Sequence, residues 1–240
     1  MLPSVVNLSV RSYEKELLDR DDIPFADIAQ NMKELDFINT HLGGHGITIK
    51  GFQQLLLDRK KISVCEIGCG GGDNLKAIAG YCKKKGIEVA LTGIDINKDC
   101  IAVAASQLKS LQPLLIHSDY SQVNFGTNKP HVIFSSLFCH HFKEPELATM
   151  LKWMKQNSTT GFFINDLHRH WLAYYSIKWL TALFSKSYLV KNDAPLSVKR
   201  GFKKKDWVQL LRNAHNNDYS LRWKWAFRWL LVSPNNSMIN

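Results

Sequence analysis

The 240-residue sequence contains no apolar run long enough to span a lipid bilayer, and its first residues do not resemble a secretory signal peptide. Paired cysteine motifs are also absent, because the five cysteines are odd in number and never follow Cys-x-x-Cys spacing. Reduced thiols of this kind are typical of cytoplasmic proteins. We therefore expect a globular cytoplasmic protein, long enough for one α/β unit with appended helices.

Acidic residues are in the minority, with 21 Asp and Glu against 31 Lys and Arg, which gives a net charge of +10. A basic surface can attract nucleic acid or an anionic membrane. The lysines cluster only in the short runs Lys83–Lys85 and Lys203–Lys205, which are typical of solvated helix ends. No basic arm or RNA-binding appendage is present in the sequence, so composition alone does not indicate a nucleic-acid enzyme.

A glycine-rich loop follows the apolar run Val64–Ile67 and precedes a helical stretch. It reads Glu66-x-Gly68-x-Gly70-x-Gly72, an acid followed by three glycines at every second position. Glycine has no Cβ and accepts positive φ, so such a loop lets the backbone come very close to a ligand. The spacing differs from the phosphate-binding P-loop and indicates a nucleotide or nucleoside site of another kind.

Four further apolar runs end in polar side chains. They are residues 89–94 before Asp95, 113–117 before Ser118-Asp119-Tyr120, 130–136 before His140 and His141, and 161–165 before Asp166. Five strands that alternate with helical stretches predict an α/β fold with a parallel sheet. Ligands bind at the carboxyl ends of the strands in such sheets, and an acid at the second strand end reaches ribose hydroxyls.

These motifs together resemble the Rossmann-like class I S-adenosylmethionine-dependent methyltransferases, over roughly residues 60–235. The resemblance implies S-adenosylmethionine as the cofactor and S-adenosylhomocysteine as its product. It places Glu66 near the amino group and ribose of the cofactor. Gly68 and Gly70, with Cys69 between them, would let the backbone approach the methionine part.

The same resemblance assigns roles at the other strand ends. Asp95 would hold both ribose hydroxyls, with Ile96 against the adenine. Asp119 would accept a hydrogen bond from the adenine amine, and Tyr120 would flank the ring. The pair Ser135–Ser136 would lie beside the methionine.

Two other classes of enzyme fit these motifs less well. An NAD-dependent oxidoreductase would show Gly-x-Gly-x-x-Gly, whereas the third glycine comes one residue early here. Nucleic-acid amino-methyltransferases of the superfamily carry Asp/Asn-Pro-Pro-Tyr/Phe after the fourth strand, where this chain has Ser135–Phe138, and Cys139 lacks the proline of a cytosine-C5 nucleophile. We therefore expect a small-molecule acceptor. The alternative is an RNA-binding or RNA-modifying protein that uses the fold as a binding module.

Residues 1–59 are helical in pattern and are predicted to form an N-terminal cap or lid. Ser12–Leu18 resembles a capped helix, and Pro24 starts a second helix with apolar residues at helical spacing. Gly43–Gly44 ends the second helix and precedes a third. As a lid, this segment would use the glycine pair as a hinge and bring Tyr13 or Arg11 to face the cofactor site.

Residues 60–240 are predicted to form the methyltransferase domain, with a helical insertion at about 168–200 and an antiparallel hairpin over 219–232. Residues 170–184 predict a helix that is apolar on almost all sides. Three explanations stay open for it: core packing, the wall of a pocket for an aromatic or lipid-like acceptor, and peripheral contact with a membrane surface. The aromatic and basic side chains involved are Trp171, Tyr174, Tyr175, Lys178, Trp179 and Lys186.

Histidines follow the fourth and fifth strands, where an acceptor would approach the methyl group. An oxygen acceptor needs a base to remove its proton, and histidine suits this near neutral pH. Our first choice of base is His141, then His140, then His168. We expect no metal, because metal-dependent catechol-type enzymes use carboxylates at both strand ends.

A narrower resemblance concerns the acceptor. Arg11–Asp19, Ile38–Gly44 and Asn165–His170 resemble methyltransferases found beside type III polyketide synthases, which act on phenolic products. The pair His140–His141 is similar to that of quinone-biosynthesis C-methyltransferases and related small-molecule enzymes. These resemblances imply O-methylation, with C-methylation as an alternative, of a hydrophobic phenol or quinol in small-molecule secondary metabolism. The oligomeric state is not indicated.

Overall fold

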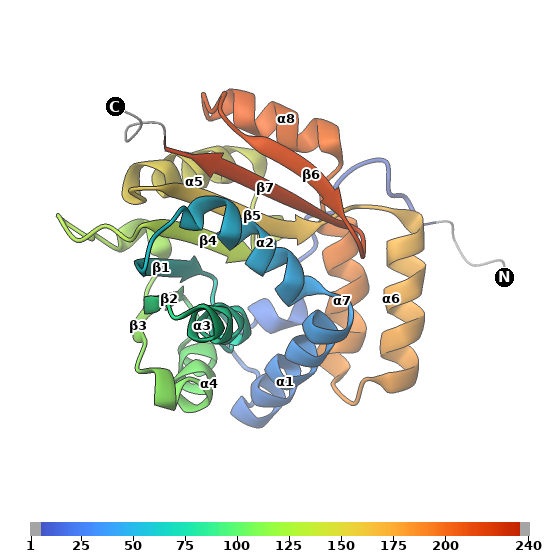
Figure 1. The fold of residues 1–240 in the computed structure, drawn as a ribbon. Coiled ribbons are helices and arrows are strands. Elements are labelled where there is room, and N and C mark those ends of the chain that lie inside the picture. The colour runs from blue at the N-terminus through green and yellow to red at the C-terminus, as the bar shows by residue number, and fades with distance from the viewer. Residues whose placement is uncertain (1–5, 236–240) are drawn as a thin grey trace, which may run out of the picture.

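A seven-stranded sheet forms the centre of the protein in this computed structural model, which describes residues 6–235. The strands lie in the order β3-β2-β1-β4-β5-β7-β6 (Figure 1). Their bounds are β1 Lys61–Ile67, β2 Glu88–Asp95, β3 Leu114–His117, β4 Val132–Ser136, β5 Gly161–Leu167, β6 Ser220–Lys224 and β7 Arg228–Pro234. Strands β1 to β5 pair in parallel, and β7 pairs antiparallel with β5 and β6. The predicted Rossmann-like sheet with an antiparallel C-terminal hairpin is confirmed.

Helices surround this sheet on its two faces and at one of its edges. They are α1 Phe25–His41, α2 Gly44–Leu56, α3 Asp73–Lys85, α4 Lys98–Gln107, α5 Glu144–Asn157, α6 Trp171–Phe184, α7 Tyr188–Arg200 and α8 Lys204–Asn213. Side chains of α2 and α3 pack with one face of the sheet, and those of α5 and α8 pack with the other. Strand β4 is buried along its whole length as a result, as is usual for a parallel strand between two helical layers.

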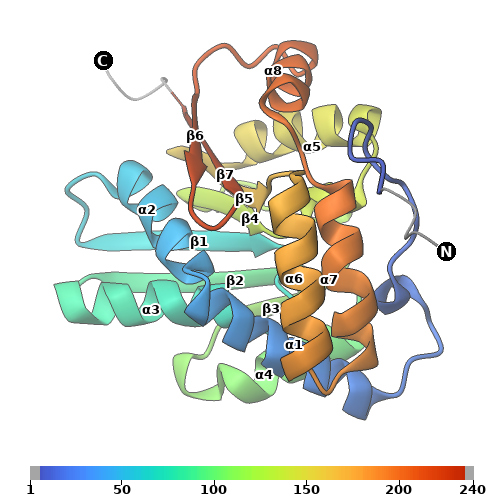
Figure 2. The same cartoon turned by 90° about the vertical axis from the view of Figure 1, so that its right-hand side faces the viewer.

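The parallel strands all point their carboxyl ends toward α1, α6 and α7, which lie beyond that edge of the sheet (Figure 2). This arrangement leaves the loops after β1 to β4 between the sheet and these helices. Within residues 6–235, no helix combines the length and apolar character needed to cross a membrane.

The N-terminal segment differs from the prediction at its start. The helix expected from Ser12 is wrong: only Leu17–Asp19 forms one 3-10 turn, η1. The backbone amides find partners on α7 instead, since Ser12 donates to the Lys199 carbonyl at 3.1 Å and Leu17 donates to the Asp193 carboxylate at 2.8 Å. These tertiary hydrogen bonds satisfy groups that a helix would have satisfied locally. The second and third predicted helices are present as α1 and α2.

The inserted segment is a pair of helices rather than one. The predicted aromatic helix is α6, and α7 packs along its side (Figure 2). The turn between them is held by α1, because the Glu34 carboxylate accepts hydrogen bonds from the backbone of Lys186 and Ser187 at 3.0 and 3.1 Å.

We expect the substitution Phe52→Ala to lower the free energy of unfolding by about 3–5 kcal/mol, the usual cost of deleting a buried aromatic ring. Phe52 on α2 is completely buried in the core shared with the sheet. The control is Phe37→Ala on α1, where the ring is 61% exposed and the change should stay within about 0.5 kcal/mol. Urea denaturation measures both, and equal losses in the two variants would contradict the packing of α2 on the sheet.

Candidate functional site

A cavity of about 1040 Å³ lies at the carboxyl edge of the parallel strands. The loops after β1, β2, β3 and β4 form one part of its wall. Residues of η1, α1, α6, α7 and the turn between β6 and β7 form the rest. The cavity therefore lies where polar strand ends predicted a ligand site, and segments distant in sequence close it.

The glycine loop after β1 approaches its surroundings very closely. Gly68 and Gly70 have φ of +66° and +50°, in the left-handed region that favours glycine. A Cβ on Gly68 would come within 2.2 Å of the Phe138 ring. Cys69 is buried between the two glycines and donates its backbone N–H to the carbonyl of Ile94 at 3.1 Å. All three loop residues line the cavity, as predicted from the sequence.

Asp95 ties the end of β2 to this loop. One carboxylate oxygen accepts from the Gly70 N–H at 2.8 Å, and the other accepts from the Asn97 N–H at 2.9 Å. Burial raises the pKa of Asp95, while these two backbone donors act in the opposite direction. Ile96 follows it into the cavity with 68% of its surface exposed. An anchored acid beside an exposed apolar side chain is a suitable arrangement for a ribose and the base attached to it.

Glu66 is a buried carboxylate on the cavity wall. It is 1% exposed, and its Oε2 atom has no hydrogen-bond partner among the described residues. Burial, followed by the charge of Asp73, raises its pKa well above the usual value. A buried oxygen without a partner is costly unless a ligand supplies a donor. The ammonium of the methionine part of S-adenosylmethionine, or a hydroxyl of its ribose, would supply such a donor.

The ends of β3 and β4 complete this half of the cavity with Asp119, Tyr120 and Ser136. Asp119 accepts from the Ser121 N–H at 2.8 Å, which fixes its side chain. Tyr120 is half-buried and packs edge-on against Trp153 at 5.2 Å between ring centroids. Burial raises the pKa of Tyr120 to about 12, so the ring stays neutral.

Three residues predicted for the site do not line the cavity. Ser135 lies on the other side of β4 from Ser136, and its hydroxyl is 3.3 Å from the Cys139 thiol. Tyr13 places its hydroxyl 2.6 Å from the Glu144 carboxylate. His168 accepts from the Trp223 indole at 3.2 Å through Nδ1, and burial lowers its pKa to about 4.

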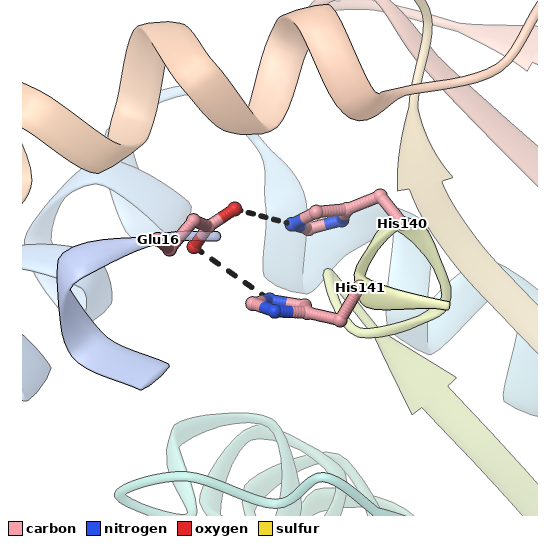
Figure 3. A group of neighbouring side chains, drawn as sticks. All are labelled: Glu16, His140 and His141. Atoms are coloured by element: carbon pink, nitrogen blue, oxygen red, sulfur yellow. Dashed lines mark ion pairs between the residues drawn. The ribbon is translucent and has the colours of Figure 1, made fainter. Parts of the chain in front are cut away.

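The histidine pair faces a carboxylate from the N-terminal segment. His140 and His141 lie in the 3-10 turn η4, Cys139–His141, after β4. Their Nε2 atoms lie 3.4 and 3.7 Å from the two oxygens of Glu16 (Figure 3). The Nδ1 of His140 donates to Asp166 at 2.8 Å, and the Nδ1 of His141 lies 3.3 Å from Asp19. Each ring is thus held by one carboxylate and turned toward a shared one.

The two histidines differ in burial and therefore in how accessible their rings are to a ligand in the cavity. The side chain of His140 is 2% exposed and that of His141 is 22% exposed. Burial alone would lower the pKa of His140, but the charges and hydrogen bonds of Asp166 and Glu16 raise it to about 9. Burial raises the pKa of Asp19, and the hydrogen bond and charge of His141 outweigh it and lower the pKa to about 2. His140 is therefore a buried cation, and His141 is the ring that a ligand can touch.

The sequence did not reveal that Glu16, Asp19 and Arg200 belong to this group. Arg200 is buried and donates to the carbonyls of His140 and His141 at 3.2 and 2.9 Å. It also lies 3.8 Å from Glu16 and 3.6 Å from Asp19. The only signal for the two acids was their place in the segment that resembles known methyltransferases, because they lie more than a hundred residues from the histidines.

The same group contains atoms that could hold a metal. Ligand atoms of Glu16, His140 and His141 lie within 4.8 Å of one another, and two histidines with one glutamate form a set that zinc accepts. The atoms already pair with each other, and Arg200 adds a positive charge beside Glu16. The expectation that the site works without a metal stays a prediction.

Comparison with known proteins finds a methyltransferase domain in this chain. Residues 64–161 match the family model described as a methyltransferase domain. A curated relative, the mitochondrial ubiquinone biosynthesis O-methyltransferase of Saccharomyces cerevisiae, is 26% identical over 137 residues. The match covers 55% of this chain and 41% of that protein, so it spans well under half of the relative's length.

Solved structures share the fold. A S-adenosylmethionine-dependent methyltransferase from Aquifex aeolicus superimposes with a TM-score of 0.61 at 14% identity, over 86% of this chain and 98% of its own. The plantazolicin methyltransferase BpumL in complex with SAH gives a TM-score of 0.60 at 21% identity, over 85% and 74% of the two chains. These similarities concern the arrangement of the sheet and its helices.

The charge of His140 predicts a particular pH dependence of stability. Its folded pKa of about 9 lies above the usual 6.5, so its stabilising contribution is complete below pH 6.5 and is lost as the pH rises through 9. We expect the unfolding free energy of the wild type, relative to His140→Gln, to fall by about 3 kcal/mol over this interval. Urea denaturation at several pH values measures it, with exposed His41→Gln as the control. A parallel decline in wild type and His140→Gln would contradict the buried cation.

The cavity suits the cofactor that the family uses. Glu66 presents an oxygen without a partner, the loop holds two glycines at positive φ, and Asp95 and Asp119 lie at successive strand ends. The matched domain, the strand order and these residues agree with one another. Residues 64–161 form a methyltransferase domain, and the chain has the fold of solved S-adenosylmethionine-dependent methyltransferases.

Proposed function

We propose that the protein O-methylates a hydrophobic phenol or quinol, with S-adenosylmethionine as the methyl donor and His141 as the general base. One observation carries the proposal: His141 lines the same cavity as the glycine loop, with Asp19 3.3 Å from its Nδ1 and Glu16 3.7 Å from its Nε2. The name of the yeast relative, an O-methyltransferase of ubiquinone biosynthesis, agrees with an acceptor of this class.

The composition of the cavity supports an apolar acceptor. Side chains from five segments of the chain contribute carbon surface to it, namely Leu18, Leu35, Phe138, Leu180 and Phe227. A cavity of about 1040 Å³ lies at the upper end of the usual size for small-molecule sites, so there is room for a cofactor and an acceptor together.

Each residue of the histidine group has its own role in the proposed reaction. The cofactor supplies an electrophilic methyl group when bound, so catalysis requires mainly alignment and removal of the acceptor proton. The His141 Nε2 lies 3.7 Å from Glu16, beyond hydrogen-bond distance, so it is available to accept the hydroxyl proton of an acceptor. The methyl group would pass from the sulfonium of the cofactor to the acceptor oxygen, and S-adenosylhomocysteine would be the leaving group. Glu16 and Asp19 would stabilise the resulting imidazolium. Buried Arg11 and Arg200 hold the histidine turn in place by donating to its backbone carbonyls.

The N-terminal segment supports a further part of the proposal. Ile28, Met32 and Leu35 of α1 line the cavity, and Gly43, with φ of +76°, joins α1 to α2. We propose that α1 and η1 act as the lid over bound ligands. Opening would move Glu16 away from the histidines and expose the base to water, so closure would assemble the catalytic group.

RNA binding stays the alternative function. The lysine runs that give the chain its charge lie in the last turn of α3 and at the start of α8. Neither run lines the cavity. Strong, salt-dependent RNA affinity without methyl transfer would favour this alternative.

The test is methyl transfer from labelled S-adenosylmethionine to a panel of hydrophobic phenols and quinols, followed by mass spectrometry of the products. We expect transfer to oxygen, and a loss of about 10²–10⁴-fold in kcat for His141→Gln, the usual contribution of a general base. His168→Gln is the matched control, because that histidine lies outside the cavity, and a chelator should leave the rate unchanged. Unaltered turnover in His141→Gln would refute its role as the base, and loss of activity with the chelator would assign Glu16, His140 and His141 to a metal.

A further inference from the structure

Helix α6 exposes an apolar face that the proposed reaction does not use. Its inner side is buried through Ala173, Tyr174 and Thr181. The other side carries two adjacent rows of residues at i, i+4 spacing. The first row is Trp171, Tyr175, Trp179 and Leu183, and the second contains Leu172, Leu180 and Phe184.

These side chains are unusually exposed for their size. Trp179 is 67% exposed, Leu183 71% and Phe184 76%. No other segment within residues 6–235 covers them, and α6 lies at the outside of the molecule (Figure 2). A contiguous apolar patch of this kind marks a surface that binds something, since single proteins in water rarely leave one exposed.

The apolar face continues to the mouth of the cavity. Leu180 and Ser176, on the second row, line the cavity as well as the surface. Trp225, in the turn between β6 and β7, is 70% exposed and also lines it. An apolar molecule could therefore move from this surface into the cavity along apolar side chains, without passing through water.

The charged side chains of the segment that contains α6 are all basic, and Glu34 of α1 is the acid that contacts the turn after this helix. No Asp or Glu occurs between Asp166 and Asp193 in the sequence, whereas Lys178, Lys186 and Lys191 are exposed. The Lys178 ammonium lies 5.9 Å from the Tyr174 ring centroid, so a positive charge lies directly among the aromatic side chains. Lysine is depleted at the centres of protein–protein interfaces, and two copies of this face would bring like charges together.

We propose that the exposed face of α6, together with Trp225, binds the surface of an anionic lipid bilayer. Tryptophan and tyrosine prefer the boundary between headgroups and acyl chains, and lysines beside them attract anionic headgroups. The helix has 14 residues and lies in the plane of the interface rather than across the bilayer. A hydrophobic acceptor would then pass from the lipid to the cavity; this consequence rests on the proposed function, whereas the binding does not.

Vesicle sedimentation tests the binding without cofactor or acceptor, so its failure and a failure of methyl transfer are separate results. Wild-type protein should sediment with vesicles of phosphatidylglycerol and phosphatidylcholine, and less with phosphatidylcholine alone. The double substitution Trp179→Ser and Leu183→Ser should reduce the bound fraction about tenfold. The matched control is Leu114→Ser on β3, where the side chain is 60% exposed, and this variant should bind as the wild type does.

Three results would overturn the proposal. The first is wild-type protein that stays in the supernatant when anionic vesicles sediment, because the protein then does not bind the bilayer surface. Equal binding by the wild type and the double variant places any lipid contact elsewhere. A wild-type dimer that the double variant converts to a monomer, without vesicle binding in either, shows that the face joins two copies of the chain.

Discussion

The contact between Gly68 and the Phe138 ring is the constraint on which the site depends. A Cβ at Gly68 would lie 2.2 Å from that ring, so only glycine permits the loop after β1 to pack against the loop after β4. Phe138 directly precedes the turn that carries His140 and His141. One close approach therefore sets the distance between the glycine loop and the histidine pair that contains the proposed base.

The histidine turn is also held by residues from the N-terminal segment and from the end of α7. Arg11 donates to the carbonyl of Phe142 at 3.0 Å, and Arg200 donates to the carbonyls of both histidines. Glu16 lies between the two rings. A buried carboxylate beside the cations of His140 and Arg200 is stable only while these partners remain, so folding of the N-terminal segment and assembly of the group around Glu16 are coupled.

The sequence predicted much of the fold and the part of the candidate site that lies at the strand ends. The reasons are physical. Strands with glycines and acids at their carboxyl ends are local patterns, so the loop at Glu66–Gly72 and the acids Asp95 and Asp119 were found where the structure has them. Side chains alternate across a strand, so only one of Ser135 and Ser136 could face the cavity, and the sequence did not distinguish them. The partners of the histidines come from a segment whose backbone conformation depends on contacts with α7. No local pattern encodes such contacts, and the segment around Ser12 was therefore predicted as a helix.

The loop that first indicated a ligand site is also the place to test it. Calorimetry of S-adenosylhomocysteine binding should show an affinity at least about tenfold weaker for Gly68→Ala, because alanine is strained at φ of +66° and displaces the Phe138 ring. Gly80→Ala on α3 is the matched control, since nothing lies within 4 Å of its Cβ, and it should bind as the wild type does. Equal affinity in Gly68→Ala and Gly80→Ala would contradict a cofactor site built on this loop.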